Sequence, residues 1–242
     1  MPSHMDTHRS VVTRAIAPAL VALLLTSGSL GCSSTKTVAP SADTGPAPDS
    51  PANAVHRIEW TWNRLDPSAL DLVTEDFVFA LAEGDSAGQP WHGSPWTRAV
   101  EVAALTRMFD TTAAVPRMRQ LTLQLDRTMI ALPDPRPGKN NKWHRTIRSH
   151  VDLTAKLDIS GGLDVWIVTG NALFFLVRGD SAAIPPELFA RGVRPDSTRW
   201  WVERWEDETL SGGAALRPEP ARNLTLGMLK SLFLPALPAL RR

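Results

Sequence analysis

The sequence lacks tyrosine altogether and has a single cysteine, Cys32, among its 242 residues. The absence of tyrosine excludes catalysis by a phenol group. Without a second cysteine the chain forms no intramolecular disulfide, and a domain of this size does not need one to be stable. Acylation of Cys32 would also exclude thiol catalysis and cysteine metal sites.

An excess of charge of either sign is also missing. The chain has 26 Lys and Arg against 25 Asp and Glu, a formal net charge of +1. There is no block of basic residues and no alternation of basic and aromatic residues, the features that mark nucleic-acid binding. We therefore expect no nucleic-acid partner.

The N-terminal apolar run is too short to cross a membrane. It covers about 11 residues, 15–25, whereas a helix rising ~1.5 Å per residue must span a hydrocarbon core of ~30 Å. Arg9 and Arg14 precede the run and small residues follow it, which is the order of an export signal. The segment Leu30-Gly31-Cys32 resembles the bacterial lipoprotein signal, in which the cysteine is lipid-modified.

The resemblance implies a signal peptide over 1–31 and a palmitate-type anchor on Cys32 that holds the protein in the lipid bilayer. Residues 32–50, rich in Ser, Ala, Pro and Thr, are expected to form a disordered tether. The protein would then belong to the bacterial cell envelope, facing the periplasm or the exterior. The alternative is an ordinary secretory signal with Cys32 buried in the fold.

Three helices are predicted after the tether. Ser50-Pro51 is an N-cap followed by proline at the first helical position, and Asp66-Pro67 repeats this signal for a short helix ending near Glu75-Asp76. Ser94-Pro95 caps a third helix, which ends at about Phe109. The first helix has one apolar face, formed by Val55, Ile58, Trp62 and Leu65.

The second half of the chain alternates with a period of two, which indicates half-buried strands. Strands are expected over 77–81, 117–129, 151–159, 163–178 and 198–209. Ser160-Gly161-Gly162 is expected to form a tight hairpin turn, because glycine adopts the positive φ that such turns require. The domain would cover 51–210, followed over 211–242 by a tail with a short amphipathic helix formed by Leu226, Leu229 and Phe233. We expect this helix to pack back on the domain; the alternative is a tail that binds a partner or touches the membrane, with Arg241 and Arg242 at its end.

The order of elements resembles the nuclear transport factor 2-like (SnoaL-like) superfamily. The segments that carry the resemblance are Ile58–Asp66, Leu72–Phe79 and Arg199–Trp205. It implies an α+β fold over about 52–209, in which a cone-shaped, curved antiparallel sheet is covered by three N-terminal helices.

Some members of that superfamily are isomerases and cyclases that use a carboxylate base in the cone. When the sequence is laid on the ketosteroid isomerase pattern, the tyrosine falls near Ile58 and the base near Leu81, and both positions are apolar. A shift could bring Glu83 or Asp85 to the base position, but no tyrosine is available. We therefore predict no catalytic residues.

Five residues are candidates for the wall of a ligand pocket. By parity of the last strand, Trp201 and Glu203 share a face with Trp205 and Asp207. This strand is interpreted either as an aromatic side packed inward with ion pairs outside, or as an aromatic ligand wall with Glu203 as its polar anchor. The candidates are Ile58, Trp62, Phe79, Trp201 and Glu203.

Two histidines suggest a metal site at first sight. His144 and His150 are six residues apart and share a strand face with Arg148 and Asp152. That face is polar and carries an arginine, which disfavours a cation, so a solvated outer face is the better interpretation. No metal and no cofactor are predicted.

Two classes of function remain. The first is a non-enzymatic envelope lipoprotein whose cone binds a small apolar ligand, or whose sheet binds an envelope protein or a second copy to form a homodimer. The second is a pocket enzyme: an isomerase, a cyclase or a hydrolyase. We favour the first, because the familiar catalytic positions are apolar. Two titratable groups converging inside the cone would favour the second.

Overall fold

The computed structural model describes residues 44–82, 96–209 and 221–234, so Cys32 and the signal peptide lie outside the described residues. The helices are α1 (Pro51–Trp62), the 3-10 helix η1 (Pro67–Leu72), α2 (Arg98–Phe109), α3 (Pro186–Ala190) and α4 (Leu226–Ser231). The strands are β1 (Val73–Ala80), β2 (Trp96–Thr97), β3 (Arg117–Leu125), β4 (Leu132–Pro133), β5 (His144–Ile159), β6 (Gly162–Arg178), β7 (Trp200–Thr209) and β8 (Ala221–Asn223).

The strands form one sheet in the order β2-β1-β7-β6-β5-β3, with β4 also paired to β5 and β8 to β6. Most neighbours are antiparallel, as expected, but β1 pairs with β7 and β8 pairs with β6 in parallel. Parallel neighbours need a long crossover, and the whole chain from α2 to α3 lies between β1 and β7. The antiparallel meander predicted from Arg117 onward holds for β3, β5, β6 and β7. The parallel strands β1 and β8 make the complete sheet mixed.

The long strand β5 follows the predicted alternation, whereas β6 is buried on both faces over 174–177. The inward side chains of β5 are fully buried, while the even-numbered residues at its polar positions face outward. Ser160 and Gly161 make the hairpin turn to β6, and Gly161 and Gly162 have φ of 121° and 131°. The predicted glycine turn is confirmed.

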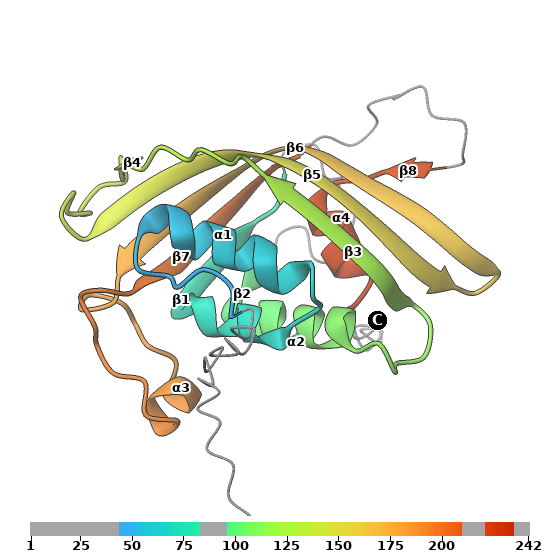
Figure 1. Cartoon of the computed structure of the whole chain (residues 1–242), viewed down its shortest axis with the longest axis horizontal. Coiled ribbons are helices and arrows are strands. Elements are labelled where there is room, and N and C mark those ends of the chain that lie inside the picture. Colours follow the sequence, from blue (N-terminus) through green and yellow to red (C-terminus); the bar gives the residue numbers. More distant parts are fainter. Residues whose placement is uncertain (1–43, 83–95, 210–220, 235–242) are drawn as a thin grey trace, which may run out of the picture. The chain divides into compact units, whose positions relative to one another are not determined.

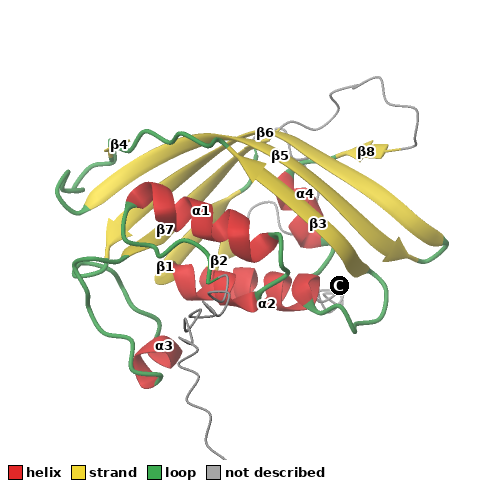
Figure 2. Ribbon diagram, viewed as in Figure 1, coloured by secondary structure: helices red, strands yellow, loops and turns green. Residues whose placement is uncertain are grey.

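The helices α1, α2 and α4 cover the concave side of the curved sheet (Figure 1). Ser50 caps α1 by accepting a hydrogen bond from Asn53 N at 3.1 Å, and Ile58 and Trp62 on the predicted apolar face are buried. Leu226, Leu229 and Phe233 bring α4 into the same core. The three predicted N-terminal helices are present as α1, η1 and α2, and η1 adds Ala69 and Leu72 to the same core. The C-terminal helix α4 completes the cover (Figure 2).

Two of the predicted helix boundaries are wrong. The second helix ends at Leu72, and the chain is already extended at Val73, because the side chains of Val73 and Phe77 enter the core from a strand paired with β7. Glu75 and Asp76 are consequently exposed strand residues. The third helix begins at Arg98, since the two residues before it pair with β1; Ser94 and Pro95 lie outside the described residues.

Residues outside the predicted range 51–210 contact the domain at both ends. Trp200 N donates to Pro48 O at 2.8 Å, and the Arg57 guanidinium donates to Thr44 O. The last residues of the expected tether are therefore attached to the domain. The C-terminal helix is likewise part of the domain core, as its apolar face predicted.

The edge strand β3 is covered by side chains of α1. Asn63 Nδ2 donates to Leu123 O at 2.9 Å, and Leu123 N donates back to Asn63 Oδ1 at 2.6 Å. Leu125 N donates to Glu59 Oε1 at 3.4 Å. The backbone groups of β3 at these positions are therefore not open to a further strand.

Candidate binding site

An aromatic row crosses the concave side of the sheet. The register places Trp96 beside Phe79, Phe79 beside Trp205, and Trp205 beside Phe174, so that β2, β1, β7 and β6 each contribute one ring. The centroids of neighbouring rings in the row lie 5.5, 5.9 and 4.7 Å apart. Trp62, at the end of α1, packs on Trp205 at 5.5 Å. We call Trp96, Phe79, Trp205 and Phe174 the aromatic row.

The ammonium group of Lys230 lies against this aromatic surface. Its Nζ is 3.7 Å from the ring centroid of Phe79, 4.4 Å from that of Trp205 and 5.5 Å from that of Trp62. The side chain of Lys230 is fully buried. A cation within ~6 Å of a ring centroid is attracted by the negative face of the ring, most strongly where water is excluded.

Glu101 supplies the countercharge. It lies on the buried face of α2 together with Ala104, Leu105 and Met108. Its Oε1 is 2.7 Å from Lys230 Nζ, and its Oε2 accepts a hydrogen bond of 2.7 Å from Trp96 Nε1. The lysine thus has a carboxylate partner as well as three rings, and we call Lys230, Glu101, Phe79, Trp62 and Trp205 the ammonium cage.

Asp207 connects the cage to the start of α4. Its Oδ2 accepts from Gly227 N at 2.8 Å, while its Oδ1 accepts from Thr209 N at 3.0 Å and from Thr209 Oγ1 at 2.5 Å. Thr209 Oγ1 in turn accepts from Leu226 N at 2.9 Å. These bonds use side chains of β7 to satisfy backbone donors in the first turn of α4.

Burial shifts the pKa values of Lys230 and Asp207 in the direction that favours the neutral form of each side chain. Burial lowers the pKa of Lys230, although the carboxylates of Glu101 and Asp207 oppose this shift. Burial raises the pKa of Asp207, against the hydrogen bonds from Thr209 and Gly227. The cage therefore holds a cation at a desolvation cost that its rings and its carboxylate must offset.

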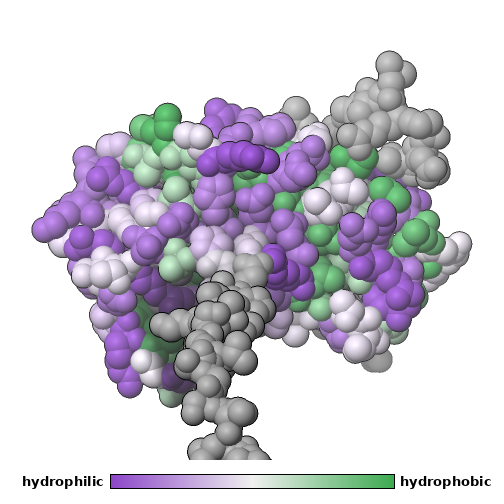
Figure 3. Space-filling model, in the orientation of Figure 1, coloured by the Kyte–Doolittle hydropathy of each residue, from purple (hydrophilic) through white to green (hydrophobic). Residues whose placement is uncertain are grey.

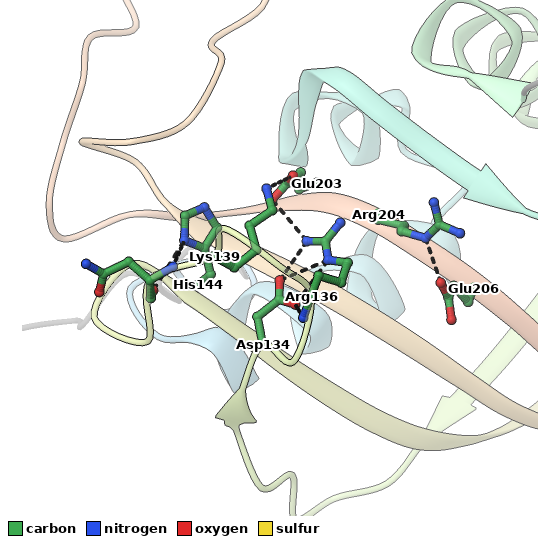
Figure 4. A network of polar contacts seen from close by, with 8 residues as sticks. Asp134, Arg136, Lys139, His144, Glu203, Arg204 and Glu206 are labelled. Atoms are coloured by element: carbon green, nitrogen blue, oxygen red, sulfur yellow. Dashed lines mark hydrogen bonds and ion pairs between the residues drawn. The ribbon is translucent and has the colours of Figure 1, made fainter.

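The convex side of the sheet carries a second, more exposed cluster of charges (Figure 4). The Arg136 guanidinium lies between Asp134, at 2.7 Å, and Glu203, at 3.2 Å, and Lys139 also bonds Glu203. Arg136 stacks on the ring of Phe175 at 4.2 Å. We call Asp134, Arg136, Lys139 and Glu203 the outer network; it attaches the segment after β4 to the sheet.

A β-bulge in β7 corrects the predicted parity of the last strand. Arg204 pairs with Phe175 and Val202 with Leu176, so Glu203 is one extra residue without a partner in β6. Trp205 consequently joins the inner core, whereas Trp201 packs in a separate outer cluster with Val177 and Leu188. The prediction that Trp201, Glu203 and Trp205 share one face is wrong.

The five predicted pocket residues are therefore divided between the two faces of the sheet. Ile58, Trp62 and Phe79 are buried in the inner core, and Trp201 and Glu203 lie in the outer cluster and the outer network. Whether they contact a ligand stays a prediction.

The two charged members of the cage, Glu101 and Lys230, are not among the residues predicted from the sequence. A signal for Lys230 was present, because it continues the helical spacing of Leu226, Leu229 and Phe233 and so falls on the apolar face. Glu101 has the same spacing relative to Ala104, Leu105 and Met108.

Other candidate features are weaker. No group of three or more metal-ligating side chains occurs among the described residues, and His150 is exposed on the polar face of β5. An open hollow of about 420 Å³ lies at the β5–β6 turn, where its charged residues, Asp164 and Arg222, pair with each other at 3.1 Å. No helix in the described ranges is long and apolar enough to span a membrane.

Comparison with known proteins gives distant structural similarities. No protein-family model matches the sequence, and no curated protein matches it. A conserved protein from Planctomyces limnophilus is 12% identical, with 65% of this chain and 91% of that chain covered at a TM-score of 0.41. A ketosteroid isomerase-like protein from Erwinia carotovora is 14% identical, with 66% and 92% covered at 0.39. A nuclear transport factor 2-like superfamily protein from Salmonella enterica is 14% identical, with 70% and 92% covered at 0.38.

These values are low, and nothing about the function of this chain follows from them. The observed architecture nevertheless agrees with the predicted fold class: helices lie on the concave side of a curved, mostly antiparallel sheet. The described domain has an α+β fold with a mixed, mostly antiparallel sheet, which is the architecture that the resemblance noted in the sequence implies.

Proposed function

We propose that the protein is a lipid-anchored envelope lipoprotein whose folded domain is a non-catalytic binding module. The observation that carries the binding role is the ammonium cage. It places complementary groups around a cation: three aromatic faces, and a carboxylate 2.7 Å from Lys230 Nζ. Aromatic faces and a carboxylate are the groups with which proteins bind an ammonium ion.

Converging titratable groups would also suit an enzyme, and Lys230, Glu101 and Asp207 do converge inside the fold. Both oxygens of Glu101 are bonded, to Lys230 and Trp96, and both oxygens of Asp207 accept hydrogen bonds. The Lys230 side chain is fully buried. A general base or a nucleophile must reach the substrate within hydrogen-bond distance, and in this arrangement these groups reach one another. The contacts support binding over isomerase, cyclase or hydrolyase chemistry.

The lipid anchor is supported by the sequence around Cys32 and by the short length of chain between Cys32 and the described domain. About 12 residues separate Cys32 from Thr44, the first described residue. A chain of that length extends at most ~40 Å, so an anchored domain would stay close to the bilayer surface.

Membrane fractionation tests the anchor. We expect the wild-type protein to sediment with membranes and to label with a palmitate analogue, and Cys32→Ala to be released into the soluble fraction. Ser33→Ala is the matched control and should remain with the membranes. An unlabelled wild-type protein, together with Cys32→Ala that still sediments with membranes, would refute the anchor.

Mass spectrometry of the soluble Cys32→Ala protein tests the binding module. Native spectra should show a co-purified ligand or protein bound to the domain. Denaturation should release this molecule with its mass unchanged. Detection of a reaction product of that molecule, formed in proportion to protein concentration and time, would instead make the domain an enzyme.

A further inference from the structure

We propose that the ammonium cage is a binding site for an aliphatic primary amine, and that Lys230 occupies it in cis as a substitute for the free ligand. The inference rests on the proposed binding role and names the class of ligand. It applies to the described side chains of α1, α2, β1, β7 and α4, which together surround one ammonium nitrogen.

The distances select the kind of cation. Lys230 Nζ is 2.7 Å from Glu101 Oε1 and 3.7 Å from the ring centroid of Phe79. A hydrogen-bond distance to the carboxylate requires an N–H on the cation, and a quaternary ammonium has none. The short distance to Phe79 also leaves no room for N-methyl groups. The site therefore suits a primary ammonium on an unbranched apolar stem, the shape of the lysine side chain itself.

The cage also has hydrogen-bonding capacity that the chain does not use. Trp205, whose ring lies 4.4 Å from Lys230 Nζ, is buried, and its Nε1 has no hydrogen-bond partner among the described residues. Buried polar groups are normally paired, and an unpaired one costs stability. An amine that also carries an acceptor, such as a hydroxyl or a second neutral amine, could bond this group.

Exchange of Lys230 with a free ligand requires the helix α4, which carries Lys230, to leave the core. The helix α4 has only six residues, and so short a helix has little stability of its own. Three side-chain acceptors hold its first turn: Thr225 Oγ1, Thr209 Oγ1 and Asp207 Oδ2.

Displacement of α4 would leave Glu101 buried beside Trp96 with no cation. An unpaired buried carboxylate is strongly unfavourable, so the opened cage would take up another cation. Ligand binding and release of the C-terminal helix would thus be coupled.

The first test uses the full-length Cys32→Ala protein with Lys230→Ala, which removes the ammonium and its stem. We expect n-butylammonium to raise the Tm of this variant by about 2–4 °C at a concentration several times its Kd. Neither n-butanol nor tetramethylammonium should do so. Lys230→Met, which keeps the stem volume but not the charge, should not respond to n-butylammonium. If folded Lys230→Ala shows no shift, or shifts equally with n-butanol, the ammonium site is refuted.

The second test uses the same parent protein with Lys230 intact and therefore does not depend on the folding of a cage variant. Cadaverine should cause a loss of hydrogen-exchange protection at the amides of 226–231, while an equal ionic strength of NaCl should not. Unchanged protection at saturating cadaverine would refute the competition with Lys230. Failure of both tests would refute the amine site alone. The lipid anchor is tested separately by fractionation, and a binding role for a ligand of another class is tested separately by native mass spectrometry.

Discussion

The ammonium cage and the outer network bring the same kinds of group together on opposite faces of the sheet. Inside, Glu101 and Lys230 meet beside aromatic rings, with side-chain exposures of 2% and 0%. Outside, Glu203 meets Lys139 and Arg136, with exposures of 11%, 24% and 25%. The inner pair must offset a much larger loss of hydration, and so its contribution depends on both partners being present.

The pKa values of two carboxyl groups, Asp207 beside the cage and Asp134 in the outer network, shift in opposite directions. Burial raises the pKa of Asp207, whose direct partners are the neutral donors of Thr209 and Gly227. Burial alone would also raise the pKa of Asp134, but hydrogen bonds from Arg136 outweigh it and lower that pKa. Asp207 is the more deeply buried of the two and has no cation in direct contact among the described residues, whereas Asp134 is bonded to Arg136, so the two differences act in the same direction.

The largest effect is expected from breaking the inner pair. Glu101→Ala should lower the free energy of unfolding by about 3–5 kcal/mol, because it leaves Lys230 buried without its carboxylate. The matched outer change, Glu203→Ala, should cost about 1 kcal/mol or less. Urea unfolding of both variants measures the two values. Equal losses would show that the two clusters do not differ in the way their burial indicates.

The double variant Glu101→Leu with Lys230→Met sharpens the same comparison. Replacing both charges with apolar side chains of similar volume should restore stability to near the wild-type value, since no buried charge remains. If the double variant is as unstable as Glu101→Ala, the loss of stability in Glu101→Ala does not come from the unpaired charge of Lys230.

The next effect concerns Trp62, the ring that α1 contributes to the cage. Trp62 is 1% exposed and packs on Trp205 and Phe109 at centroid distances of 5.5 and 5.9 Å. Trp62→Ala should lower the free energy of unfolding by about 3 kcal/mol or more, as core truncations do. A nearly unchanged Tm with loss of a co-purified ligand would instead identify Trp62 as a wall of a ligand pocket.

Asp134 and Asp207 should affect the pH dependence of the free energy of unfolding in opposite ways. The lowered pKa of Asp134 means that its contribution is present above its ordinary pKa of about 3.9 and is lost as the pH falls toward its folded-state pKa. The raised pKa of Asp207 acts in the opposite way: stability falls as the pH rises from about 3.9 to its folded-state pKa.

Asp134→Asn should therefore weaken the loss of stability in acid, and Asp207→Asn should make that loss steeper. Urea unfolding between pH 3 and pH 7 measures both slopes relative to wild type. The same change of slope in the two variants would contradict the opposite shifts.

A small effect, similar in size to that of Glu203→Ala, is expected at the β5–β6 turn, which touches neither cluster. Gly161 has a φ of 121°, and a Cβ added there would meet no atom within 4 Å. Gly161→Val should cost about 1 kcal/mol through backbone strain alone. Because strain is local, the response of Lys230→Ala to n-butylammonium should be the same with and without this change. Thermal unfolding checks the first expectation, and a changed amine response would couple the turn to the cage.

Local patterns in the sequence were sufficient for much of the fold. The Ser50-Pro51 signal and the apolar spacing of the first helix predicted α1, and alternation with a glycine turn predicted the β5–β6 hairpin. These features depend on interactions between residues close in the chain, such as a cap, a turn and the side-chain period, and so short segments of sequence are enough to recognise them.

Contacts between distant segments decided the candidate site. The bulge at Glu203 separates Trp201 from Trp205, and the parallel pairing of β1 with β7 brings Phe79 beside Trp205. The cage then joins Glu101 to Lys230 across 129 positions of the chain. A period along one strand or helix shows that a residue faces inward, but only the packing of α2 and α4 on the same part of the sheet determines which charge it meets there.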